Sequence, residues 1–147
     1  MEASNPIQVI INYALIGMEV VSSKIAEPNE LLPLSNSIGF FINIEHQFNL
    51  DENLLSSFST FVLNNSDTNE TYASITIKYD FNVEDLKTFF NNEAKKLMLP
   101  QEFVVVVNSL SISSSRGVIH MLFNGTNLRN FILPIIDPTA LVFNKQQ

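Results

Sequence analysis

Three segments of the chain, at residues 40–48, 55–63 and 72–81, are predicted to be strands. Hydrophobic and polar residues alternate in the first and third, and the second would set Phe58, Thr60 and Val62 on one face against Ser57, Ser59, Phe61 and Leu63 on the other. Strict alternation is typical of strands that bury one face. The positions that share the apolar face of the first and third segments are Phe40, Ile42, Ile44, His46, Phe48, Ala73, Ile75, Ile77, Tyr79 and Phe81. Polar turns at residues 49–53 and 64–69 separate the segments, which predicts an antiparallel meander with one covered face.

The segment before this meander supports two interpretations. Its apolar residues from Ile7 to Met18 fit a helical period, whereas its many isoleucines and valines and the internal Gly17 favour a strand. We interpret residues 12–23 as a first strand, which a proline-bracketed loop separates from the meander.

After the meander the period of the pattern changes. Asn82 is a suitable helix cap, and Glu84 and Asp85 would lie in the first turn, where carboxylates favour the positive end of the helix dipole. Apolar residues then recur at helical spacing. They are Val83, Leu86, Phe89, Phe90, Ala94 and Leu97. This spacing predicts a helix over residues 82–97.

A second, longer helix is predicted from Pro100 to Leu122. Proline is well tolerated in a first helical turn, and the segment is far longer than an ordinary strand. Its four consecutive valines also suit a buried strand, so the length of the segment decides for helix. The residues expected to share one helical stripe are Phe103, Val107, Leu110 and Ser114.

Residues 124–127 read Asn-Gly-Thr-Asn and predict the end of this helix. The chain is then expected to be extended as far as Pro138, with at most one short helix at residues 139–144. Strands come first and helices last, which predicts an α+β fold in a single domain over residues 1–147.

Composition narrows the functional classes. Of the 147 residues, 46% are hydrophobic and 16% are charged, and 12 are phenylalanine, so we expect apolar surface that is hidden in an oligomer or exposed for binding. The absence of cysteine and of a basic, apolar leader predicts a cytoplasmic protein. No apolar run approaches the length of about 20 residues that a membrane helix needs.

Charge and motifs argue against other classes. The net charge of −7 is opposite to that of most nucleic-acid binders. His46 and His120 stand alone on separate elements, and the serines of residues 109–115 lack a nucleophile-elbow motif. We therefore expect no enzyme activity, catalytic residue, cofactor or metal site.

Four short motifs occur in order in the last third of the chain. They are Leu99-Pro100, Ser115-Arg116-Gly117, Leu133-Pro134 and Asp137-Pro138. In this order, after four strands, they resemble the SecB-like family of bacterial protein-export chaperones. The resemblance implies a four-stranded antiparallel sheet, a long helix packed on one face and a short C-terminal helix. It also implies a homotetramer, a dimer of dimers with the long helices between the sheets.

The resemblance implies a function as well. Family members bind unfolded preproteins in apolar grooves, without ATP or metal, and deliver them to the translocase motor. The expected client contacts are Phe41, Phe123, Phe131, Ile132, Leu141 and Phe143. The helix residues expected to pack on the sheet or across the oligomer interface are Phe103, Val107 and Leu110. Glu19 and Glu45 are the strand carboxylates available to contact the translocase motor.

An alternative stays open. Divergent relatives serve as chaperones dedicated to an antitoxin, and no residue pattern separates this role from general export. A dedicated interaction protein for one partner is therefore the second hypothesis, and neither hypothesis involves nucleic acid or membrane insertion.

Overall fold

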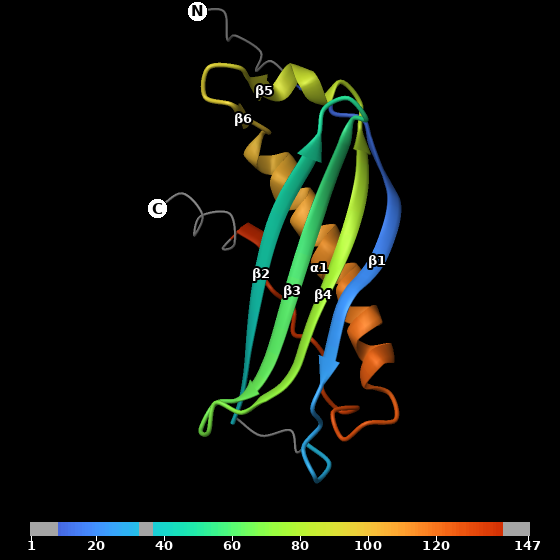
Figure 1. Ribbon diagram of the computed structural model, residues 1–147, viewed down its shortest axis with the longest axis vertical. Helices are drawn as coiled ribbons and strands as arrows, with labels where there is room; N and C mark the ends of the chain where they lie inside the picture. Colours follow the sequence, from blue (N-terminus) through green and yellow to red (C-terminus); the bar gives the residue numbers. More distant parts are fainter. Residues whose placement is uncertain (1–8, 33–36, 140–147) are drawn as a thin grey trace, which may run out of the picture.

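Four long antiparallel strands form the main sheet, in the order β1-β4-β3-β2 (Figure 1). The computed structural model describes residues 9–32 and 37–139. Within these, the strands are β1 (Tyr13–Ile25), β2 (Ile38–Asn49), β3 (Leu54–Asn65) and β4 (Thr71–Val83). The four expected strands are confirmed, each with boundaries one to two residues from the expected ones. β1 and β2 are the two edge strands.

The inner face of the sheet carries the apolar positions expected from the alternation. Along β4, every second residue from Ala73 to Val83 is buried. The register sets Leu55, Ser57, Ser59 and Phe61 of β3 beside these residues. The core therefore lies on one side of β3 and β4, the two central strands.

The outer face of the two central strands carries mostly polar side chains, together with Phe58 and Val62. Ser56 donates a hydrogen bond to Asp80 across the two central strands, with 2.6 Å between the oxygens. Asp80 also lies 3.3 Å from the ammonium group of Lys78. Side chains that satisfy one another across neighbouring strands let this face meet water without a covering layer.

One long helix, α1 (Gln101–Phe123), crosses the inner face obliquely (Figure 1). It starts immediately after Pro100, and it ends before Gly125, whose φ of 82° belongs to the left-handed region that favours glycine. The helix prediction over the four valines is thus confirmed. After Val107, the buried residues of the helix include Ser111, Ser115 and Ile119, but neither Leu110 nor Ser114. The expected stripe through Leu110 and Ser114 is therefore wrong beyond Val107.

A buried polar seam joins α1 to the sheet. The Ser115 hydroxyl donates to the carbonyl of Ser111, and the phenol of Tyr79 lies 2.7 Å from the Ser115 oxygen. Because the single Ser115 proton is already used, Tyr79 is the donor to Ser115. The hydroxyl oxygens of Ser111 and of Ser57 in β3 lie 3.2 Å apart and form a second hydrogen bond between the helix and the sheet. These serines are fully buried, and their small size lets the helix backbone approach the sheet closely.

The helix expected over residues 82–97 is not formed. In its place are a short 3-10 helix, η1 (Leu86–Phe89), and a small hairpin of β5 (Phe90–Asn91) and β6 (Lys96–Leu97). Pairing of β4 with β1 keeps Val83 in the sheet, and the left-handed φ values of Asp85 and Lys95 interrupt any continuous helix. Sheet pairing thus overrides a helical spacing of apolar residues.

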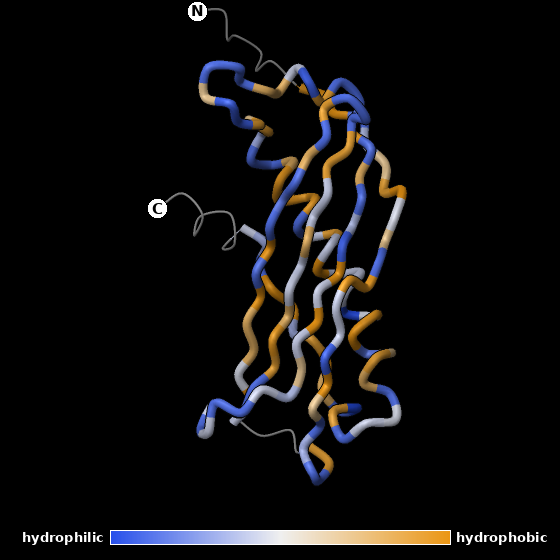
Figure 2. Tube along the Cα trace, viewed as in Figure 1, coloured by the Kyte–Doolittle hydropathy of each residue, from blue (hydrophilic) through white to orange (hydrophobic). Residues whose placement is uncertain are grey.

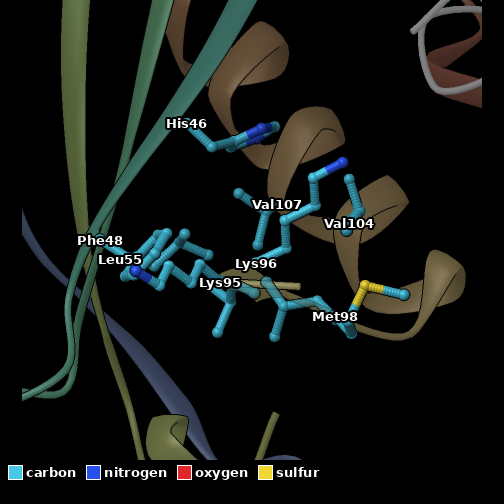
Figure 3. A pocket seen from close by; sticks show the side chains of 10 residues that line it. His46, Phe48, Leu55, Lys95, Lys96, Met98, Val104 and Val107 are labelled. Carbon is cyan, nitrogen blue, oxygen red and sulfur yellow. The ribbon is translucent and has the colours of Figure 1, made fainter. Parts of the chain in front are cut away.

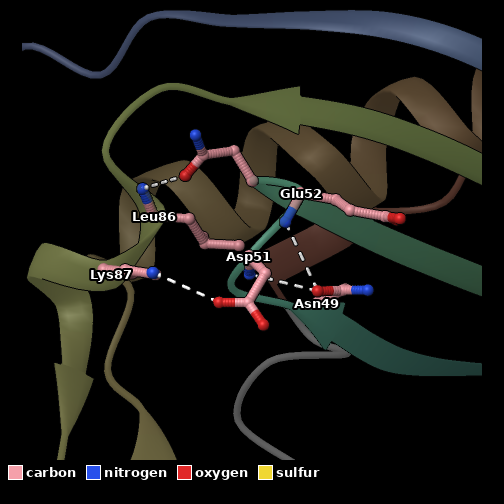
Figure 4. A network of polar contacts seen from close by, with 6 residues as sticks. Asn49, Asp51, Glu52, Leu86 and Lys87 are labelled. Atoms are coloured by element: carbon pink, nitrogen blue, oxygen red, sulfur yellow. Dashed lines mark hydrogen bonds and ion pairs between the residues drawn. The ribbon is translucent and has the colours of Figure 1, made fainter.

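The turn between β2 and β3 holds η1 in place (Figure 4). Asn49 accepts hydrogen bonds from the backbone amides of Asp51 and Glu52. Asn53, at the end of the same turn, accepts one from the amide of Leu86, and Asp51 lies 3.2 Å from the ammonium group of Lys87. These contacts fix the position from which the β5–β6 hairpin projects.

The segment that follows α1 returns along the inner face. Arg116 ties it to the helix, because Nε donates to the carbonyl of Leu133 at 2.9 Å and Nη2 donates to that of Pro134 at 3.2 Å. Two of the motifs behind the family resemblance are therefore in direct contact. Residues 138–139 are helical, and the rest of the expected terminal helix lies outside the described residues.

Because the Tyr79 hydroxyl is buried, we predict that the free energy of unfolding falls at alkaline pH. Burial raises the pKa of Tyr79, and the hydrogen bond with Ser115 opposes this rise only in part. The neutral phenol therefore stabilises the fold fully below pH 10, the usual tyrosine pKa. This stabilisation is lost as the pH rises toward the higher pKa of the folded state, by at most about 1.4 kcal/mol per pH unit. Urea unfolding at pH 8 and pH 11 measures this loss.

Tyr79→Phe should lower the free energy of unfolding by about 1 kcal/mol at pH 8 and reduce the further loss at pH 11. The control is Tyr13→Phe, which removes a hydroxyl from a partly exposed tyrosine and leaves the Tyr79–Ser115 hydrogen bond in place. An equal alkaline loss in the wild type and Tyr79→Phe would contradict this assignment.

The Arg116 contacts predict a local destabilisation. Arg116→Lys keeps the charge but removes the planar fork that reaches two carbonyls, so the free energy of unfolding should fall by about 1 kcal/mol. Hydrogen exchange of residues 131–136 should become faster. Arg129→Lys is the matched control, because Arg129 donates to the carbonyl of Thr126 in its own turn. Unchanged exchange in Arg116→Lys would show that the fork does not hold this segment.

Candidate functional site

A hollow of about 450 Å³ lies between the edge strand β2, the β5–β6 hairpin and the first turns of α1 (Figure 3). Its lining residues come from four elements and from the link before α1. They are His46, Phe48, Leu55, Lys95, Lys96, Leu97, Met98, Leu99, Val104 and Val107. A concave apolar site with a few polar groups is the usual form of a binding pocket.

Phe48 and the β5–β6 hairpin shape one end of the hollow. Phe48 projects from β2, where the sheet ends, and it contacts Phe90 of the hairpin with 5.9 Å between ring centroids. The hairpin turn is fixed by Asn91, which accepts hydrogen bonds from the amides of Glu93 and Ala94. Phe48 is 43% exposed and Met98 is 61% exposed, so apolar surface at the mouth is accessible to a partner.

A polar contact between opposite walls joins His46 to Asn108 of α1. The His46 Nε2 atom lies 2.9 Å from the Asn108 Oδ1 atom. Asn108 is buried and His46 is half-buried, so this contact holds the helix at a set distance from the edge strand. His46 therefore has the structural role of an interface residue between elements.

The structure does not gather the predicted client contacts into one site. Phe41 is 64% exposed, but its register with Val62 places it on the outer face. Phe123 is 1% exposed and belongs to the core, with Phe131 packed against it at 6.2 Å between ring centroids. Ile132 is 61% exposed on the returning segment. Leu141 and Phe143 lie outside the described residues.

The two predicted translocase contacts share one row of the outer face. Cross-strand pairing links Glu19 to Lys78, Lys78 to Phe58 and Phe58 to Glu45. Lys78 lies 6.0 Å from the centroid of the Phe58 ring. The two carboxylates therefore stand on opposite edge strands, with a cation and an aromatic ring between them.

A second apolar area lies away from the hollow. β1 leaves large side chains exposed along the open edge of the sheet, where hydrophobic positions recur in Figure 2. They are Tyr13, Leu15, Ile16, Met18, Val20 and Val21. Among the predicted interface residues, Phe103 and Val107 are already buried in the protomer, and Leu110 is 38% exposed. An interface role stays a prediction, with Leu110 the best placed of the three.

Sequence reasoning missed the hairpin side of the hollow. Residues 95–99 were expected to lie at the end of a helix and in the link to the next one, which hides their shared position. The available signal was the pair Lys95-Lys96 next to the apolar run Leu97-Met98-Leu99. A cationic pair beside apolar residues indicates an amphipathic surface. The hairpin, which the sequence pattern did not predict, places this surface opposite β2.

No protein-family model matches the chain, and no curated protein matches it in sequence. Among solved structures, the fold is similar to that of Rv1957, a SecB-like chaperone of Mycobacterium tuberculosis. That structure is a complex with a ChAD peptide from the Rv1956 HigA1 antitoxin. The match has a TM-score of 0.55 at 9% sequence identity and covers 84% of this chain and 90% of that one.

Among the described residues, no helix is both long enough and apolar enough to cross a membrane. This match extends over most of both chains, and it supports the fold of four antiparallel strands and one long helix. The chain therefore has a divergent SecB-like fold.

Proposed function

We propose that this protein is an ATP-independent chaperone that binds extended segments of unfolded polypeptides. The observation that carries the proposal is the open apolar hollow beside β2, an edge strand that pairs only with β3 among the described residues. An edge strand offers backbone amides and carbonyls to an added strand, and an adjoining pocket accepts one of its side chains. Apolar burial is non-directional, so such a site tolerates many client sequences.

The similar fold of a chaperone solved with an antitoxin peptide supports this proposal. It also favours the alternative, a chaperone dedicated to a single partner such as an antitoxin. For the export role, the row that contains Glu19 and Glu45 is the surface we propose for the translocase motor. A pull-down separates the roles, because export predicts many preproteins and a dedicated role predicts one stoichiometric partner.

Self-association is part of the proposal. The outward face of α1 contains Val106, Leu110, Gly117 and Met121, and the three larger side chains are exposed. A Cβ atom added at Gly117 would meet open space. Between Glu102 in the first turn and His120 in the last, the exposed residues of α1 are uncharged. An apolar helix face is usually buried, so we infer that α1 and the apolar edge of β1 pack against further copies.

The holdase activity can be tested by light scattering during refolding of a chemically unfolded client. The wild type should suppress aggregation at a few-fold molar excess, and Phe48→Ser should weaken suppression several-fold, because it removes apolar surface at the mouth of the hollow. Phe58→Ser is the matched control, since Phe58 lies on the outer face of the sheet. Absence of suppression by the wild type would reject the proposed function.

The assembly can be tested by multi-angle light scattering. A mass near four times 16.6 kDa is expected for a dimer of dimers, and Leu110→Asp should lower it, because the new charge would be buried at the interface. Ile135→Asp is the control, because Ile135 is exposed on the returning segment. A monomeric wild type would contradict self-association.

A further inference from the structure

We propose that the hollow selects polypeptide segments in which a large apolar residue is flanked by carboxylates. This inference rests on the proposed function and names the class of client that the same site prefers. It follows from the placement of Lys95 and Lys96 at an apolar site in an otherwise acidic chain.

The two lysines face the hollow from the hairpin. Lys96 extends toward Val104 and Val107, and Lys95 extends toward Phe48 and Leu55 (Figure 3). The left-handed φ of 51° at Lys95 and the pairing of Lys96 with Asn91 fix the backbone that carries them. Their alkyl stems thus cover apolar surface while the ammonium groups stay in water.

Most other cations of the described chain have partners. Lys78 lies within ion-pair distance of Asp80, and Lys87 lies within ion-pair distance of Asp51. Arg116 and Arg129 donate to backbone carbonyls. In contrast, neither Lys95 nor Lys96 has a carboxylate within ion-pair distance among the described residues.

None of the described residues that line the hollow is acidic, although the chain has a net charge of −7. The site is therefore a local region of positive charge on an acidic protein. A client that presents carboxylates beside its apolar anchor gains two charge interactions there, whereas a basic client meets repulsion. The surrounding negative charge would disfavour acidic clients everywhere else on the surface, which focuses them on this site.

The expected preference is modest. Exposed ion pairs contribute little each, so two of them should give about a fivefold gain in affinity at low ionic strength. Screening at high salt should remove most of this gain and leave the apolar contribution.

The test uses three fluorescent peptides of equal length that share a phenylalanine core and carry glutamate, glutamine or lysine on both sides. Fluorescence anisotropy with the full chain should rank their affinities as glutamate, then glutamine, then lysine. In a Lys95→Gln/Lys96→Gln variant the glutamate peptide should bind no more tightly than the glutamine peptide. The control is Lys24→Gln/Arg129→Gln, which has the same net charge and should keep the ranking.

Each result decides a different question. Equal affinity for all three peptides would overturn the selectivity and leave the chaperone proposal standing. A glutamate preference that persists in Lys95→Gln/Lys96→Gln would place the selectivity elsewhere and overturn the assignment to the hollow. No peptide binding together with no suppression of aggregation by the wild type would reject both proposals.

Discussion

The structure depends on how closely α1 can approach the two central strands. Serines on both sides of the contact leave room for the helix where it crosses β3 and β4. Hydrogen bonds between Tyr79 and Ser115 and between Ser111 and Ser57 satisfy these four buried hydroxyl groups. Larger apolar side chains at both ends of the helix then close the core. The helix leaves the edge strands incompletely covered, so the hollow beside β2 and the exposed apolar strip of β1 follow from one packing arrangement.

The strands were predictable because alternation reports directly on which face is buried. β4 shows this best, since its inward residues are buried and its outward residues are polar. α1 was predictable from length, but the direction of its buried face was not, because serines and an asparagine, rather than Leu110, face the sheet. A hydropathy pattern cannot show that small polar residues will be buried when their partners lie on another element.

The candidate site was less predictable than the fold. Helical spacing after Asn82 was coincidental, because Val83 is retained by its pairing with Tyr13 and the next residues turn on left-handed positions. Both determinants are distant in sequence or specific to backbone geometry, so periodicity does not reveal them. The aromatic residues expected at one client site lie apart in the structure, with Phe123 in the core and Phe41 on the opposite face of the sheet. Their positions also depend on strand pairing, which periodicity does not reveal.

The two irregularities in β1 have a consequence for solubility. The register skips Ile16 and Val21, each of which falls between paired residues, and such bulges twist and bend an edge strand. A regular strand of another protein cannot remain in hydrogen-bonding register along an edge interrupted twice. The two bulges therefore hinder the pairing of β1 with a strand of an unrelated protein. A partner whose shape fits the bent edge can still cover the apolar side chains of β1.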